Sequence, residues 1–198
     1  MTKSRANASI DRRSLRTRTA LRDALLELIA VRGWDDIAVR DVCERANIGR
    51  STFYLHYPNK DALLQGGLED LQAELRRQAR ARPDDACPGP EALEGFHFAL
   101  GLIEHVDGQR KVFRSVIGRR SGYVIQQRFR EMVVRLFTDE LPAATGSFPH
   151  DAVARWLAGA FVELLSWWID QHPRLSPKEL ALLFNELSRS AREGARVI

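Results

Sequence analysis

The sequence of 198 residues is poor in cysteine and has no long apolar run. Its two cysteines, Cys43 and Cys87, lie far apart and outside any CxxC pattern, so they indicate neither a disulfide framework nor a zinc site. No stretch approaches the roughly 20 apolar residues that a membrane-spanning helix needs, and the polar segment 1–10 lacks the apolar core of a secretion signal. These absences predict a cytoplasmic protein that neither crosses nor enters a membrane.

Motifs of enzyme chemistry are also absent. No GxxxxGK[ST], GxGxxG or GxSxG sequence occurs, and no set of Ser, His and Asp indicates nucleophilic catalysis. The histidines show no HxH or HExxH spacing, and Glu94 with His97 is one carboxylate–histidine pair where a di-metal bundle needs two. We therefore expect no catalytic residue, no metal and no cofactor.

Helical periodicity runs through most of the chain, and no stretch shows the alternation of a β-strand. The pattern predicts an all-α fold of about nine helices, with a head of three helices at 1–60 and a helical bundle at 61–198. A Pro- and Gly-rich loop is expected at 81–90. The expected helices are 12–32, 39–46, 50–56, 60–80, 91–106, 109–116, 122–141, 150–171 and 177–193.

Local signals mark several helix ends. Gly33 and Asn47 both tolerate the left-handed conformation, so they suit the end of the first helix and the turn after the second. Ser176 and Glu179 form a capping box at the start of the last helix. The pair at 66–67, two glycines inside the fourth helix, indicates either a close contact or a hinge.

Positive charge is concentrated at one end of the chain. Residues 1–60 hold 12 Lys and Arg against 7 Asp and Glu, a net charge of +5, whereas residues 61–198 hold 18 against 19. An excess confined to one module is typical of a surface that binds a polyanion such as nucleic acid. Charge alone leaves open a solvated basic face that binds nothing.

The second and third predicted helices are joined by a tight turn, as in proteins that place one helix in the DNA major groove and rest its neighbour on the backbone. The outward positions of the third helix include Arg50, Ser51 and Tyr54, and Phe53 and Leu55 are candidates for the core. Arg50 suits bidentate hydrogen bonding to guanine. Spacing alone leaves open a short core helix with no role in DNA binding.

The stretch DVCERANIGRSTFYLHYPNKDALL, residues 41–64, closely resembles the helix-turn-helix signature of the tetracycline repressor (TetR) family. It departs from the family at Ala38, Asn47 and Gly49, where Thr, Gly and Ser are usual. The resemblance implies binding to double-stranded DNA at a palindromic operator, with an N-terminal arm and a grip on phosphates. The residues that it implies in DNA binding are Arg12, Arg13, Arg16, Arg40, Arg50, Ser51, Thr52, Tyr54, His56, Tyr57 and Lys60.

The segments 161–169 (FVELLSWWI) and 173–186 resemble the C-terminal domain of the TetR subgroup of dihydroxyacetone-kinase regulators. This resemblance implies a homodimer whose last two helices form the interface. The helix 150–171 is apolar nearly all round, so it is the central core helix, a helix buried against a second subunit, or both. The expected interface residues are Trp156, Ala160, Trp167, Trp168, Leu180, Leu183, Phe184 and Leu187.

The family also implies a small-molecule effector bound in the body. The expected function is a DNA-binding transcriptional regulator, a repressor released by a small molecule and not an enzyme. Two alternatives stay open: a helical enzyme or carrier whose basic N-terminus binds an acidic partner, and the same fold with a body that binds another protein. Pocket candidates, which are equally good core residues, are Phe96, Leu100, Ile103, Phe113, Ile117, Tyr123, Phe129, Phe161 and Leu165.

Overall fold

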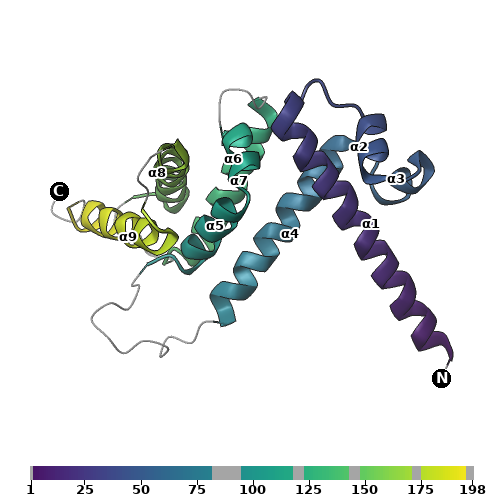
Figure 1. The fold of residues 1–198 in the computed structure, drawn as a ribbon. Helices are drawn as coiled ribbons and strands as arrows, with labels where there is room; N and C mark the ends of the chain where they lie inside the picture. Colours follow the sequence, from purple (N-terminus) through teal and green to yellow (C-terminus); the bar gives the residue numbers. More distant parts are fainter. Residues whose placement is uncertain (1, 82–94, 118–122, 143–147, 171–174, 195–198) are drawn as a thin grey trace.

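Nine α-helices and no strand occur in the residues that the structure, a computed structural model, describes: 2–81, 95–117, 123–142, 148–170 and 175–194. Side chains are described for 12–81, 95–114, 123–142, 148–170 and 175–190. The helices form two lobes, a head and a body (Figure 1). They are α1 (Thr2–Arg32), α2 (Val39–Ala46), α3 (Arg50–His56), α4 (Lys60–Ala81), α5 (His97–Gly108), α6 (Arg110–Ile117), α7 (Tyr123–Glu140), α8 (His150–Asp170) and α9 (Pro177–Gly194).

The all-α prediction is confirmed, and α2 and α3 have the predicted bounds. Helix α1 begins at Thr2, ten residues earlier than predicted, so the segment before Arg12 continues the predicted helix towards the N-terminus. The predicted loop 81–90, apart from Ala81 at the end of α4, falls outside the described residues. The boundary at residue 60 between the two lobes stays a prediction.

Helix α5 begins at His97, several residues later than predicted, because a carboxylate from another helix caps it there. The backbone N–H groups of His97 and Phe98 donate to Glu140 of α7 at 2.6 and 3.1 Å. Burial raises the pKa of Glu140, although these hydrogen bonds oppose the rise. A cap supplied from 42 or 43 residues away has no local signature in the sequence.

The head packs around the apolar stripe of α1. Leu21, Leu25 and Ile29 are almost fully buried, as their spacing on one helix face predicts. Phe53 of α3 and Leu63 of α4 are also buried in this cluster. The head core therefore fixes α3 against α1 and the first turn of α4.

The body is built around a cluster of phenylalanines. Phe137 makes edge-on contacts with Phe96 and Phe98, with ring centres 4.6 and 4.8 Å apart, and Phe161 contacts Phe184 in the same way at 4.8 Å. Such geometry is favourable for aromatic quadrupoles and leaves the rings closely packed. These rings come from α5, α7, α8, α9 and the residue before α5.

Helix α4 belongs to both lobes. Leu63 and Leu64 lie in the head core, whereas Leu75 lies in the body core. Its two adjacent glycines sit at close approaches, which agrees with the first of the two alternatives predicted for them. A Cβ on Gly66 would lie 3.2 Å from Tyr57 Cε1, and one on Gly67 would lie 3.1 Å from Arg22 Cδ.

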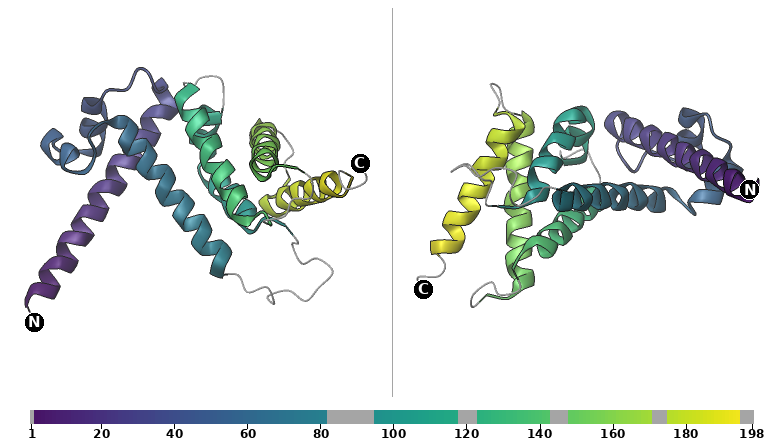
Figure 2. Two further views of the ribbon diagram at one scale, coloured as in Figure 1. Left: turned by 180° about the vertical axis from the view of Figure 1, so that it is seen from behind. Right: turned by 90° about the horizontal axis from the view of Figure 1, so that it is seen from below.

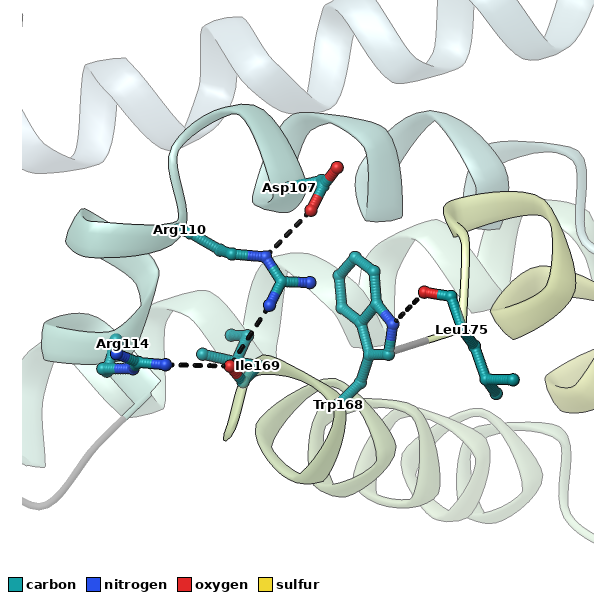
Figure 3. A network of polar contacts seen from close by, with 6 residues as sticks. All are labelled: Asp107, Arg110, Arg114, Trp168, Ile169 and Leu175. Carbon is teal, nitrogen blue, oxygen red and sulfur yellow. Dashed lines mark hydrogen bonds and ion pairs between the residues drawn. The ribbon is translucent and has the colours of Figure 1, made fainter. Parts of the chain in front are cut away.

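A polar network ties α6 to the end of α8 (Figure 3). Arg110 and Arg114 both donate to the carbonyl of Ile169, at 3.2 and 3.0 Å, which satisfies an unpaired acceptor at the C-terminal end of a helix. The Arg110 guanidinium also lies 4.2 Å from the Trp168 ring, and Trp168 Nε1 donates to Leu175 at 2.7 Å. Because α6 also packs on α1, it connects the head with α8.

Helices α8 and α9 lie at the end of the body remote from α2 and α3, as both views in Figure 2 show. In the part of the chain that the structure describes, α8 alone is long and apolar enough to cross a membrane by length and composition. Seven of its side chains, Leu157, Phe161 and Trp168 among them, are buried in the body core. Its apolar character is therefore accounted for in part by the fold of one subunit.

Candidate nucleic-acid interface

Helix α3 is anchored by a single side chain and exposes most of the others. Phe53 is completely buried in the head core and contacts the ring of Tyr57 at 6.1 Å between centres. Arg50, Ser51 and Tyr54 are exposed, as predicted. Within the described residues Arg50 makes no ion pair, so its guanidinium is available to an external acceptor.

The prediction that Leu55 faces the core is wrong, since its side chain is 82% exposed. Successive residues on an α-helix are about 100° apart, so Leu55 lies about 200° around the axis from Phe53. Once Phe53 occupies the core, Leu55 and Ser51 must both point outward. Helical geometry applied to the residue pair would have revealed this from the sequence.

The turn before α3 uses Asn47 in the left-handed conformation, with φ 53° and ψ 44°. The Ile48 N–H donates to the Cys43 carbonyl at 2.9 Å, which closes the turn. At the start of α2, where Ala38 cannot supply a side-chain cap, the Asp41 carboxylate accepts from the Ala38 N–H at 2.7 Å. The departures from the family pattern at these positions are thus compatible with the turn geometry.

The basic residues of the head differ in their surroundings. Arg12, Arg13 and Arg16 are exposed on the N-terminal half of α1. Arg40 is exposed and lies 3.5 Å from Glu44, an i,i+4 pair worth little at the surface. Arg22, in contrast, is paired with Asp70 of α4 at 3.1 Å and faces the body.

Lys60, the last basic residue of the signature, makes its contacts inside the head. Its ammonium donates to the carbonyls of Trp34 and Ile37, at 2.8 Å each, and lies 4.5 Å from the Trp34 ring. The resemblance to the family predicted that Lys60 binds a phosphate. The structure gives it partners that hold the α1–α2 turn against the start of α4.

Three further predicted residues are half-buried: Thr52 in the first turn of α3, and His56 and Tyr57 at its end. The Tyr57 ring packs on the backbone of α4 at Gly66, and burial raises the pKa of its hydroxyl. The His56 and Tyr57 rings lie 6.4 Å apart. These side chains are therefore less accessible than Arg50, Ser51, Tyr54 and Leu55.

Two family models match this chain, and together they cover both lobes. Residues 21–66 match the model of bacterial regulatory proteins of the tetR family, and residues 96–190 match a transcriptional regulator C-terminal region. A mycofactocin biosynthesis transcriptional regulator, MftR of Mycobacterium tuberculosis, described as putative in its name, is 31% identical over 81% of this chain and 83% of its own length. The chain belongs to the TetR family.

Two other comparisons bear on this TetR-family chain. The transcriptional regulator YxbF of Bacillus subtilis is 43% identical over 67 residues, so the chain spans only 18% of that relative's length. The solved structure of the dihydroxyacetone kinase operon activator DhaS has a TM-score of 0.58 at 18% identity, over 89% of this chain and 96% of its own. That likeness shows a shared fold. The TetR-family relatives are transcriptional regulators, not enzymes, and they act on DNA operators as dimers with small-molecule effectors.

The TetR-family chain exposes an apolar surface on its last two helices, which we call the α8–α9 face. Trp156 and Trp167 are 52% and 45% exposed, and Ala160 lies exposed between them on the same side of α8. Leu187 and Leu182 of α9 are about half exposed. Leu182 was not among the predicted interface residues, although Leu180 and Leu183 were.

Three of the predicted interface residues need correction. Trp168, Leu180 and Phe184 are almost fully buried in the core of this same chain, so they support the α8–α9 face from beneath. Leu183 is half-buried. The periodicity of α9 identified its apolar side but could not separate residues of the subunit core from those at the surface.

The predicted effector pocket is also corrected in part. Five candidates, Phe96, Leu100, Ile103, Phe161 and Leu165, are packed in the body core. Tyr123 is exposed at the start of α7, and the side chain of Ile117 lies outside the described residues. The two others, Phe113 and Phe129, line a cavity of about 510 Å³ between the head and the body.

Proposed function

We propose that the chain is a homodimeric repressor that binds a palindromic operator in the cytoplasm and is released by a small molecule. The observation that carries the proposal is the presentation of α3, with Phe53 completely buried and Arg50, Ser51, Tyr54 and Leu55 exposed. A rigidly held helix with an outward polar face is what major-groove recognition requires. The family match over this segment supports the proposal.

In this proposal the exposed side of α3 reads bases. Arg50, at the helix start, donates two hydrogen bonds to a guanine, a contact worth about 1–3 kcal/mol of discrimination. Leu55 supplies an apolar contact for a thymine methyl group. Arg12, Arg13 and Arg16 are placed to neutralise phosphates from α1, which adds affinity without sequence preference.

The α8–α9 face is proposed as the homodimer interface. It carries two half-exposed tryptophans on a chain that has four, and exposed apolar patches with aromatic residues are typical of interaction sites. A twofold axis at this face would place two copies of α3 at the far ends of the dimer. Both copies would then read the two halves of a palindrome.

Helix α4 is the proposed link between effector and operator. Its N-terminal turn lies in the head core and its middle in the body core, so a change of tilt in the body moves the head. DNA accepts half-sites about 34–36 Å apart, or multiples of that. A small tilt of α4 would bring the two α3 helices out of that spacing.

Selection of duplexes from a random library with the purified full-length protein tests this function. The proposal expects an enriched palindrome bound with an affinity at least about 10³ times that for unrelated DNA. Enrichment of no sequence, at any salt concentration at which the protein stays folded, would contradict it. A single asymmetric site would contradict the dimeric part of the proposal.

A further inference from the structure

A cavity of about 510 Å³ lies where α1 and α4 meet α5, α6 and α7, and we call it the junction cavity. These elements converge between the two lobes in Figure 1. Its wall is mainly apolar, with Leu26 from the head, Leu68 and Leu71 from α4, and Phe113 and Phe129 from the body. The volume lies within the range of small-molecule sites, about 300–1,000 Å³.

The charged groups at the junction cavity are largely committed to one another. Arg22 pairs with Asp70 at 3.1 Å, and Arg77 pairs with Glu74 on the same helix. Asp23 adds a further exposed carboxylate, so the acidic groups outnumber the basic ones. An anionic ligand would find no unpaired basic partner in this lining and would have to break an existing pair.

Two neutral polar side chains of the cavity wall remain uncommitted in the part of the chain that the structure describes. His105 contacts the Phe113 ring edge-on at 5.7 Å, and neither its imidazole nor the side-chain amide of Gln109 makes a hydrogen bond there. Burial lowers the pKa of His105, with a further contribution from Arg22, so the ring is neutral near pH 7. Each group offers a ligand both a donor and an acceptor: the two ring nitrogens of His105, and the amide NH2 and carbonyl oxygen of Gln109.

We propose that the junction cavity binds a neutral, mainly apolar organic compound with one hydroxyl or carbonyl oxygen, which hydrogen-bonds to His105 and Gln109. The apolar body of the ligand lies against Leu68, Leu71, Phe113 and Phe129. In this proposal the effector lies between the two lobes and not inside the packed core of the body. A ligand there contacts α1 and α6 at once, so its binding fixes the head relative to the body.

The effect of the ligand on the position of the head matters only if the proposed function holds, whereas ligand binding at the junction cavity does not depend on that function. Calorimetric titration of the full-length protein at pH 7, without DNA, uses three probes with one aromatic body: 2-naphthol, naphthalene and 2-naphthoate. The expected order of affinity is 2-naphthol, then naphthalene, then 2-naphthoate. His105→Phe, which keeps the ring contact with Phe113, should weaken 2-naphthol about fivefold, the effect of one neutral hydrogen bond. It should leave naphthalene within about twofold.

His97→Phe is the matched control, because His97 is exposed on the same helix and away from the cavity. It should bind all three probes as the wild type does. Gln109→Leu is a second variant for the case in which His105→Phe fails to fold, and it too should weaken 2-naphthol and spare naphthalene.

Failure to bind both 2-naphthol and naphthalene would overturn the proposal. So would tighter binding of 2-naphthoate, or an equal loss in the His97→Phe control. Operator binding by the same sample distinguishes failure of the ligand site from failure of the proposed function. If the protein binds its operator but none of the probes, only the proposed site at the junction cavity is wrong. If the protein binds 2-naphthol but no operator, the ligand site is supported and the proposed function is wrong.

Discussion

The ammonium of Lys60 lies 4.5 Å from the centre of the Trp34 ring and donates to the carbonyls of Trp34 and Ile37 at 2.8 Å each. These contacts join the start of α4 to the turn between α1 and α2. The ammonium of Lys60, which the signature suggested for phosphate binding, is therefore bound to groups within the head. Its removal should affect the stability of the head before it affects phosphate binding.

Replacement of Lys60 by Met keeps the side-chain stem and removes both hydrogen bonds. We expect a loss of about 1–3 kcal/mol in the free energy of unfolding, because two partly buried carbonyls lose their donor. Urea denaturation measures this loss, with the exposed Lys178→Met as control. The slope of log affinity for DNA against log salt should not change. A decrease of the slope by about 1 would instead indicate a phosphate contact.

Arg50→Ala should relax the sequence preference at one guanine of each half-site. The expected loss is about 1–3 kcal/mol on the selected operator and little on operators already changed at that base pair. Arg13→Ala is the comparison, since it should weaken binding to all sequences alike and reduce the salt slope by about 1. Anisotropy titrations on a panel of single-base operator variants separate these patterns. Equal losses from Arg50→Ala on every operator would contradict base readout.

Leu55 should recognise a thymine methyl group, since its apolar side chain is 82% exposed on the face of α3 that bears Ser51. Replacing thymine by uracil, one operator position at a time, removes only the methyl group. At one position per half-site the wild type should lose affinity several-fold, whereas Leu55→Ala should show no difference between the two bases. Sensitivity to uracil that persists in Leu55→Ala would assign the contact to another residue.

Trp167→Glu should convert the homodimer into a monomer, because it places a charge on the α8–α9 face. Sedimentation velocity measures the change, and Val31→Glu serves as control because Val31 is an exposed apolar residue of the head. The monomer should keep its helical content but lose most of its affinity for the full palindrome. A Trp167→Glu variant that sediments as the wild type would place the interface elsewhere.

The pKa of His105 is lowered mainly by burial and further by the Arg22 charge, so folding favours the neutral ring. The stability that this neutral group contributes is present above its unfolded pKa, about 6.5, and is lost as the pH falls through the lower folded pKa. As the pH falls below about 6.5, the wild type should therefore lose more stability than His105→Phe. Urea midpoints over this range measure the difference, and parallel curves for the two proteins would refute it.

Local patterns were sufficient for most of the secondary structure. Asn47, Gly33 and the pair Ser176 and Glu179 act at helix ends as their chemistry predicts, with φ of 53° and 82° at the first two. The capping box shows both hydrogen bonds, at 2.7 and 3.3 Å. Each of these features involves residues within four positions of one another. Such features can be derived without knowledge of the tertiary fold.

Features that depend on distant contacts could not be derived in this way. The cap of α5 by Glu140, the pair Arg22 and Asp70, and the engagement of Lys60 by Trp34 all join residues more than 20 positions apart. Periodicity likewise marked Phe184 and Leu187 as one apolar side of α9, although one is buried in the subunit core and the other is exposed. The candidate DNA surface was predictable from a family motif, whereas the junction cavity required the packing of both lobes.

A hydroxyl-radical footprint on the selected duplex measures most directly whether α3 meets DNA twice in one assembly. We expect two protected regions related by a twofold axis, with centres about 34–36 Å apart or a multiple of that distance. The Arg50→Ala protein should lose both regions together at a concentration that saturates the wild type. One protected region, or uniform protection that salt removes, would contradict the account.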